Sequence, residues 1–430
     1  MNRIRAEFQK LRSSTLAQNA GWMLMGQGLG LVLQAGYFVL LARLLGAAEY
    51  GVYAGAFALV AIVGTYSTLG SGTLFLRYVS ADKTKFSIYW GNILLTTSVI
   101  SGVMVLLLAV VAKHLVNPAS ASVVVLAAVS NCFCSQLATC CGQVFQTFEK
   151  LRITATLNFL TNFFRLAAAA IMLAWLHHAS AWQWAWASLA VSLVAAIAAV
   201  VMVTVQFGLP RFMPRLFLSG AAEGFGYSFA TSTASAYNDL DKTMLSHYGM
   251  NVANGIYTMA YRVVDIATIP VLSIRDAAMP RFFREGTEGL RKAATLAARL
   301  LGRASLLAAL AAVVMFITAP VLPHILGHGF AGSVSALRWL CLIPLFRSFH
   351  QMAGSALTGA GEQKYRTATQ LTAAGANFGL NLWLIPTHGW LGAAWASLIT
   401  DGGLGMLNWT ILRFLAASSK KSLALESAAL

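Results

Sequence analysis

The chain has 430 residues, of which 58% are apolar and only 10% are charged. Because soluble domains carry roughly 25% charged residues, this composition excludes an ordinary soluble enzyme and indicates a protein that crosses a membrane. The formal net charge is +16. In a membrane protein, an excess of Lys and Arg reflects the sidedness of the loops, so nucleic acid is not predicted as a partner.

The sequence predicts about twelve membrane-spanning helices, since about twelve apolar stretches approach the length needed to cross a hydrocarbon core. In chain order they are 19–46, 50–74, 88–115, 122–147, 154–176, 182–207, 225–246, 252–274, 295–317, 335–357, 369–385 and 390–414. The connecting loops are short, and no soluble domain fits between them. The expected fold class is an all-α polytopic membrane protein.

Six spans in each half define the expected domains. A basic, amphipathic cytoplasmic N-terminus covers residues 1–14, and an N-lobe with spans one to six covers 15–209. A cytoplasmic linker at 210–224 then leads to a C-lobe with spans seven to twelve at 225–415. The chain ends in a cytoplasmic tail at 416–430.

Short strings recur in the two halves of the sequence. The pairs are GVY at 51–53 with GIY at 255–257, KLR at 150–152 with KYR at 364–366, and WASL at 186–189 and 395–398. Six spans return the chain to the side of the membrane where it began. The two six-helix lobes are therefore expected to form a parallel repeat, related by a two-fold axis along the membrane normal.

The basic residues predict the orientation of the chain. With both termini cytoplasmic, most of the 30 Lys and Arg residues lie on the cytoplasmic side, and the opposite loops hold only Arg43 and Lys113. This distribution follows the positive-inside rule. We expect a multi-pass protein of the bacterial cytoplasmic (inner) membrane, in contact with anionic lipids of the cytoplasmic leaflet.

No cofactor or metal site is predicted. The sequence contains no G-x-x-x-x-G-K-[ST] string, so a phosphate-binding P-loop is absent from it. The Cys-x-Cys and Cys-Cys pairs at 132–141 lie inside a predicted span, and their spacing does not match that of zinc ligands. No catalytic residue is predicted either.

Ionisable residues in the eighth predicted span are the first candidates for a substrate site. A charge at mid-bilayer costs about 2.5–3.5 kcal/mol on insertion scales, so it usually faces a partner or a wet cavity. Arg262 and Asp265 are three residues apart and share a helix face. At the repeat offset of 204 residues the first lobe has Ala58 and Ala61. The first lobe repeats the scaffold without these charges, which favours a role in substrate binding; a structural ion pair is the alternative.

Other polar residues extend the predicted substrate site. Arg275 lies near the cytoplasmic end of the eighth span, and Gln27, Gln34 and Ser235 lie on polar stripes of the first and seventh spans. The alternative for these stripes is hydrogen bonding between helices. Arg165 and Arg347 also lie mid-span, in the fifth and tenth spans. A guanidinium there suits an anionic headgroup, because arginine binds phosphate in a bidentate geometry.

Four further residues are candidates for gating or ion coupling. Asp239, Asp241 and Lys242 are grouped in the seventh span, where a structural or gating salt bridge and contact with substrate or ion are equally open. Asp401 in the twelfth span has no partner nearby in the sequence. It is either a proton site or a structural acceptor.

Three groups of motifs resemble those of oligosaccharide-lipid flippases, the polysaccharide biosynthesis or O-antigen transporter type of the multidrug/oligosaccharidyl-lipid/polysaccharide (MOP) exporter superfamily. The first is LARLLGAAEYGVY at 41–53. The second is DLDKTMLSHYGMNVANGIYTMAY at 239–261. The third is GAGEQK at 359–364 with GAA at 392–394.

The resemblance implies a central cavity lined by the first, second, seventh and eighth spans. It also implies a substrate, a polyprenyl-pyrophosphate-linked oligosaccharide, that moves from the cytoplasmic to the periplasmic leaflet on an ion gradient or membrane potential. Arg262 and Arg275 match the cationic cavity of the family. The first two spans differ from it, because Arg43 and Arg77 lie near their ends and no deeper Lys or Arg is present.

The favoured hypothesis is therefore a flippase that works by alternating access, with polysaccharide polymerase and glycosyltransferases as candidate protein partners. A cation-coupled multidrug exporter of the same superfamily is the alternative, and Asp239, Asp241 and Asp401 are compatible with it. A membrane glycosyltransferase or polymerase is disfavoured, since the predicted periplasmic loops are short and nearly free of Asp and Glu. The protein is not expected to be an enzyme.

Overall fold

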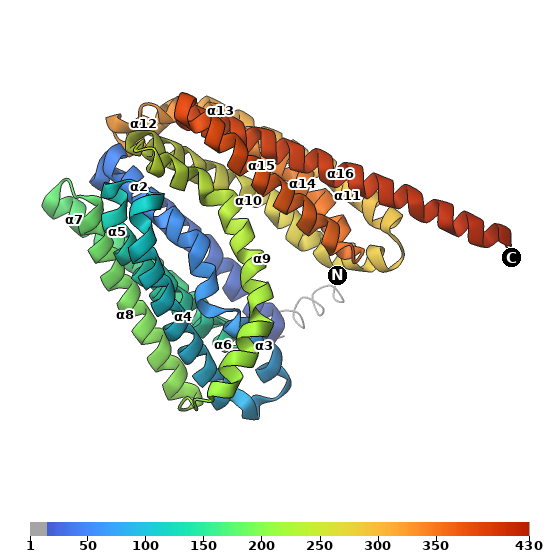
Figure 1. The fold of residues 1–430 in the computed structure, drawn as a ribbon, viewed down its shortest axis with the longest axis horizontal. Helices are drawn as coiled ribbons and strands as arrows, with labels where there is room; N and C mark the ends of the chain where they lie inside the picture. The colour runs from blue at the N-terminus through green and yellow to red at the C-terminus, as the bar shows by residue number, and fades with distance from the viewer. Residues whose placement is uncertain (1–14, 430) are drawn as a thin grey trace, which may run out of the picture. The chain divides into compact units, whose positions relative to one another are not determined.

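The computed structural model describes the backbone of residues 15–429 and the side chains of 28–229, 232–233 and 235–417. The predicted amphipathic segment at 1–14 lies outside the described residues. Over the described range the chain is helical and contains no strand (Figure 1). The predicted all-α fold class is therefore confirmed.

The elements before residue 210 are α2 (Thr15–Gly64), η1 (Thr65–Thr68), α3 (Ser71–Ala81), η2 (Lys83–Lys85), α4 (Phe86–Leu115), α5 (Pro118–Ala128), η3 (Val129–Ser135), α6 (Gln136–Thr147), α7 (Leu151–Leu176) and α8 (Ala181–Phe207). The later elements are α9 (Pro214–His247), α10 (Asn251–Thr287), α11 (Leu290–Thr318), η4 (Ala319–Val321), α12 (Leu322–Leu326), η5 (His328–Phe330), α13 (Ser333–Leu340), α14 (Ile343–Gly359), α15 (Gln363–His388) and α16 (Trp390–Ala429).

Within residues 15–429 these elements correspond to the twelve predicted spans. α2 supplies two spans because its helix is interrupted at Gly46, whose φ of 67° and ψ of 174° are not helical. Glycine adopts a positive φ without the steric cost of a Cβ atom. α5, the π-helical η3 and α6 together form one span, and α13 and α14 form another.

Six helical segments of the described chain are long and apolar enough to cross a membrane. They are Gly28–Ala81, Lys83–Leu115, Pro118–Thr147, Leu151–Leu176, Ala181–Phe207 and Leu290–Leu326. The other long helices, α9, α10, α15 and α16, carry more polar residues. Polar residues in long helices of a membrane protein are typical of helices that line a cavity or pack against one another.

The chain divides into two compact units, Met1–Asp239 and Leu240–Leu430. The expected linker at 210–224 is mostly helical in the structure, because α9 begins at Pro214. Proline is favoured at the first helical position, where its missing N–H needs no partner. The boundary between the compact units consequently falls inside α9.

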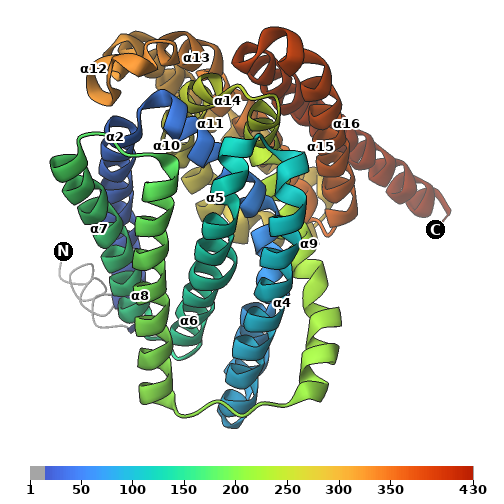
Figure 2. The same cartoon turned by 60° about the vertical axis from the view of Figure 1, so that its left-hand side comes forward.

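In the first unit, α2 packs along α7, and α7 packs along α8 (Figure 2). Val52 and Ala56 of the repeated segment are buried in a core formed with α4, α5 and α8. In the second unit, α10, α11 and α14 pack on one another and α14 packs on α16. Ile256 and Ala260, the repeat counterparts of Val52 and Ala56, are buried there as well.

The internal repeat extends to backbone conformation. α7 and α15 both have 26 residues, and each begins at a recurring KLR or KYR string. Glu149 and Gly361, just before these helices, have φ values of 58° and 80°. His177 and Gly389, just after them, both have a φ of 57°. The turns that set the helix lengths are thus repeated, although only one member of each pair is glycine.

Candidate functional site

The second unit contains a buried polar cluster built from α9, α10, α14 and α16. Asp241 and Lys242, at the end of α9, have exposed fractions of 3% and 5%. The cluster also includes two tyrosines of α10 and one serine of α16. The sequence had not indicated any of these three as candidate site residues. Burial of this many polar groups in an apolar helical unit is expected only where they satisfy one another or serve function.

Asp241 is held by hydrogen bonds from two helices. The Tyr257 hydroxyl donates to Asp241 Oδ2 at 2.5 Å, and the backbone N–H of Lys242 donates to Asp241 Oδ1 at 2.7 Å. The Tyr257 hydroxyl also lies 3.1 Å from Ser397 Oγ of α16. The Asp241 carboxylate therefore links the end of α9 to α10 directly and to α16 through one hydroxyl.

Tyr261 lies one turn beyond Tyr257, and two cations lie close to its ring. Lys242 Nζ is 5.1 Å from the centroid of its ring, and Arg347 Cζ of α14 is 5.7 Å from it. Both distances lie within the range of a cation–π interaction. Arg347 Nη1 also forms an ion pair with Asp265 Oδ1 at 3.1 Å. Asp265 therefore pairs with a residue of another helix that lies 82 positions away in the sequence. It also shares a helix face with Arg262.

Arg262 and Arg275, the predicted pyrophosphate ligands, both lie on α10. Arg262 is half-buried on the same face as Asp265. Arg275 Nε donates to Asp276 Oδ1 at 2.8 Å, and its Nη1 donates to Gln351 Oε1 of α14 at 3.2 Å. Because an acid and an amide already hold the Arg275 guanidinium, an anionic ligand there has to compete with Asp276.

Asp401 of α16 is almost completely buried, with 1% of its side chain exposed, and lies close to a histidine. His350 Nε2 of α14 is 3.5 Å from Asp401 Oδ1. This contact is an ion pair only when the histidine is protonated, and histidine is the side chain whose ordinary pKa is nearest neutral pH. The sequence left Asp401 without a partner, and packing of α14 on α16 supplies one.

A second polar region lies wholly within the first unit. A pocket of about 390 Å³ is lined by α2, η3, α6 and α7 and includes Gln34 and Arg165. Arg165 Nη2 donates to Ser192 Oγ at 3.2 Å and to Ser135 Oγ at 3.4 Å. Gln34 is exposed to this pocket, whereas the side chain of Gln27 lies outside the described residues. Ser235 and Asp239 are half-buried on α9.

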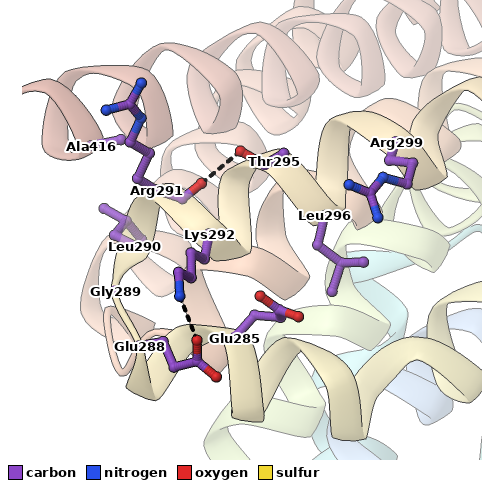
Figure 3. A pocket seen from close by; sticks show the side chains of 10 residues that line it. All are labelled: Glu285, Glu288, Gly289, Leu290, Arg291, Lys292, Thr295, Leu296, Arg299 and Ala416. Atoms are coloured by element: carbon purple, nitrogen blue, oxygen red, sulfur yellow. Dashed lines mark hydrogen bonds and ion pairs between the residues drawn. The ribbon is translucent and has the colours of Figure 1, made fainter.

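A second pocket, of about 800 Å³, lies at the turn between α10 and α11 (Figure 3). It is lined by Glu285, Glu288, Gly289, Leu290, Arg291, Lys292, Thr295, Leu296, Arg299 and Ala416. Lys292 Nζ donates to Glu288 Oε2 at 2.6 Å, and this hydrogen bond lowers the pKa of Glu288. Its charged lining residues are two glutamates and three basic residues, Arg291, Lys292 and Arg299.

The family of the chain follows from comparison with known proteins. A sequence profile of the family described as "Polysaccharide biosynthesis protein" matches residues 16–285, which is more than half of the chain. The chain belongs to this family. None of the curated protein sequences with which it was compared matches it significantly.

Members of the MOP superfamily share the fold of this polysaccharide biosynthesis family protein. An inward-facing multidrug resistance MATE transporter has a TM-score of 0.75 and 15% identity, covering 91% of this chain and 95% of its own. The lipid II flippase MurJ, in an inward closed conformation, has a TM-score of 0.71 and 13% identity, covering 92% of this chain and 87% of its own. A MOP transporter from Pyrococcus furiosus has a TM-score of 0.62 and 13% identity, covering 96% and 98% of the two chains. At these identities the comparison shows that the chain shares the fold of these transporters.

Proposed function

We propose that this family member is a flippase. It moves a polyprenyl-pyrophosphate-linked oligosaccharide from the cytoplasmic to the periplasmic leaflet of a bacterial inner membrane, with both termini cytoplasmic. The product feeds assembly of a surface polysaccharide, such as O-antigen or exopolysaccharide. The observation that carries this proposal is the polysaccharide biosynthesis family match over residues 16–285. The MurJ-like fold supports it, because that neighbour is a lipid II flippase.

In this proposal α10 supplies the cationic part of the substrate site. Arg262 binds the pyrophosphate, while Asp265 and its ion pair with Arg347 fix the neighbouring surface of α10. Arg275 exchanges Asp276 for a phosphate oxygen, since charge-assisted bonds from guanidinium to phosphate are strong. Gln27, Gln34 and Ser235 hydrogen-bond sugar hydroxyls, and the lipid tail stays in the bilayer.

Coupling is assigned to the buried acids of the second unit. Protonation of Asp241 or Asp401, or binding of a cation to either, would change the charge of a buried cluster that joins α9, α10, α14 and α16. A change of charge in a low-dielectric site alters which packing is favoured, and an ion gradient can then drive alternating access. Asp239 and Lys242 act as gating residues beside Asp241.

The alternative is a cation-coupled multidrug exporter. It is favoured by one observation, the TM-score of 0.75 with a multidrug resistance transporter. Its buried acids would then bind a cationic drug or the coupling ion. The mid-span arginines favour an anionic substrate instead. Anionic membrane lipids, a polysaccharide polymerase and glycosyltransferases are the proposed partners of the flippase.

The proposal is tested by reconstituting the purified protein in vesicles and measuring translocation of a labelled polyprenyl-pyrophosphate oligosaccharide. We expect translocation by the unaltered chain and its loss in Arg262→Ala. Arg338→Ala is the matched control, because Arg338 is exposed on α13 and lies over the Phe316 ring at 5.0 Å. Equal translocation by both variants refutes the role of Arg262. Translocation of a cationic drug but not of the lipid by the unaltered chain refutes the flippase assignment.

A further inference from the structure

The pocket in the first unit carries a charge that the proposed pyrophosphate site does not use. Arg165 lies in the middle of α7, and its hydrogen bonds to the described residues are to the neutral hydroxyls of Ser135 and Ser192. Its Nε is buried without a hydrogen-bond partner. Among the described side chains, no carboxylate lies within ion-pair distance of Arg165. A guanidinium inside an apolar span usually has a partner of opposite charge. Because Arg165 has no acidic partner among the described side chains, it is suited to bind an anionic ligand.

The rest of the pocket is polar but uncharged. Eight of its twelve lining residues have polar side chains, and none besides Arg165 is charged. The polar residues are Gln34, Ser135, Thr139, Thr154, Asn158, Thr161, Asn162 and Arg165. Side-chain amides and hydroxyls both donate and accept hydrogen bonds, as sugar hydroxyls do. The lining therefore matches a sugar ring next to a single negative charge.

The local backbone keeps this pocket open and polar. Thr154, Asn158, Thr161 and Arg165 recur at helical spacing, so they form one face of α7. Ser135, which also lines the pocket, is the last residue of the π-helix η3 (Val129–Ser135), and π-helical turns occur frequently at functional sites. A smaller pocket of about 160 Å³ shares Thr139 with the first and adds further hydroxyl and amide groups. The volume of about 390 Å³ lies within the range of small-molecule sites.

We infer that this pocket binds a carboxylate-bearing sugar residue of the glycan substrate, with Arg165 paired to the carboxylate and the α7 face hydrogen-bonded to the ring hydroxyls. The inference rests on the proposed flippase function and specifies the class of its glycan. A diphosphate fits less well, because it carries more than one negative charge and the pocket offers one cation. The substrate oligosaccharide accordingly contains an acidic sugar.

Thermal unfolding of the purified full-length protein in detergent tests this site with three probes, namely glucuronic acid, glucose and inorganic pyrophosphate. Glucuronic acid is expected to raise the unfolding temperature more than glucose does. In Arg165→Gln this difference disappears, and about tenfold more glucuronic acid is needed for the same shift. Arg338→Gln, at an exposed position of α13, retains the full response. Equal shifts with glucuronic acid and glucose, or a shift with pyrophosphate alone, overturn the inference.

A second variant keeps the test decisive if Arg165→Gln does not fold. Asn158→Leu removes a hydrogen-bonding group from the exposed face of α7, and the shifts with both sugars are expected to shrink. In reconstituted vesicles, Arg165→Gln is expected to slow translocation of an acidic lipid-linked oligosaccharide more than that of a neutral one. Equal slowing of both overturns the acidic-sugar inference alone. Absence of lipid translocation by the unaltered chain overturns the flippase proposal itself.

Discussion

Removal of the Tyr257 hydroxyl tests whether the buried cluster of the second unit depends on the Asp241 charge. Tyr257→Phe keeps the ring and removes the donor to Asp241 Oδ2, together with the contact to Ser397. Asp241 is 3% exposed, so water cannot easily replace the lost donor. A hydrogen bond to a charged group contributes about 1.5–3 kcal/mol, and we expect the variant to be destabilised by about 2 kcal/mol.

A double-mutant cycle separates the charge from the shape of the site. In a protein that already carries Asp241→Asn, the hydroxyl donates to a neutral amide oxygen, and Tyr257→Phe should cost about 1 kcal/mol. Tyr53→Phe is the matched control, because Tyr53 is the repeat counterpart of Tyr257. It stacks on Phe57 at 5.9 Å, and its hydroxyl has no hydrogen-bond partner among the described residues.

The assay is the unfolding temperature of the purified variants in one detergent at pH 7. We expect a clear decrease for Tyr257→Phe and almost none for Tyr53→Phe. An undiminished effect of Tyr257→Phe in the Asp241→Asn background refutes the reasoning, because the cost would then be independent of the carboxylate. Equal decreases in unfolding temperature for Tyr53→Phe and Tyr257→Phe refute the reasoning as well, since the hydrogen bond to the buried Asp241 would then make no difference.

Two further changes probe packing and pairing in the second unit. Asp265→Ala removes the carboxylate of the ion pair with Arg347, whose side chain is 13% exposed. Because the Asp265 side chain is 45% exposed, the free energy of unfolding is expected to fall by only about 1–2 kcal/mol. An unchanged unfolding temperature would contradict a stabilising role of the ion pair. Gly359→Ala would place a Cβ atom 2.4 Å from the backbone oxygen of Phe282, so a loss of about 1–3 kcal/mol is expected. Gly375→Ala is its control, since a Cβ there meets open space and should stabilise the helix by about 0.5–1 kcal/mol. The unfolding temperatures of the two variants are compared. A Gly359→Ala variant that unfolds at a higher temperature than the unaltered chain would contradict the close approach of Gly359 to Phe282.

The sequence alone determined the fold class, because helix length and hydropathy are local properties of the chain. It also identified the repeat, and the recurring apolar residues Val52, Ala56, Ile256 and Ala260 are buried. Span boundaries were predicted to within a few residues where Gly or a polar turn ends a helix. The bounds of the expected linker at 210–224 were not predicted to this accuracy, because Pro214 begins a helix in the structure and proline is favoured at the first helical position.

Only the tertiary structure decided which polar residues act together. The sequence placed Asp265 beside Arg262, because residues three apart share a helix face. The ion pair of Asp265 with Arg347 joins residues 82 positions apart, and local periodicity does not predict it. Nor did the sequence indicate that Tyr257 binds Asp241 or that His350 lies near Asp401. Periodicity shows which residues share one helix face, whereas the rotation and depth of each helix against its neighbours follow from packing of the whole unit. For this reason the candidate charges were visible in the sequence and their partners were not.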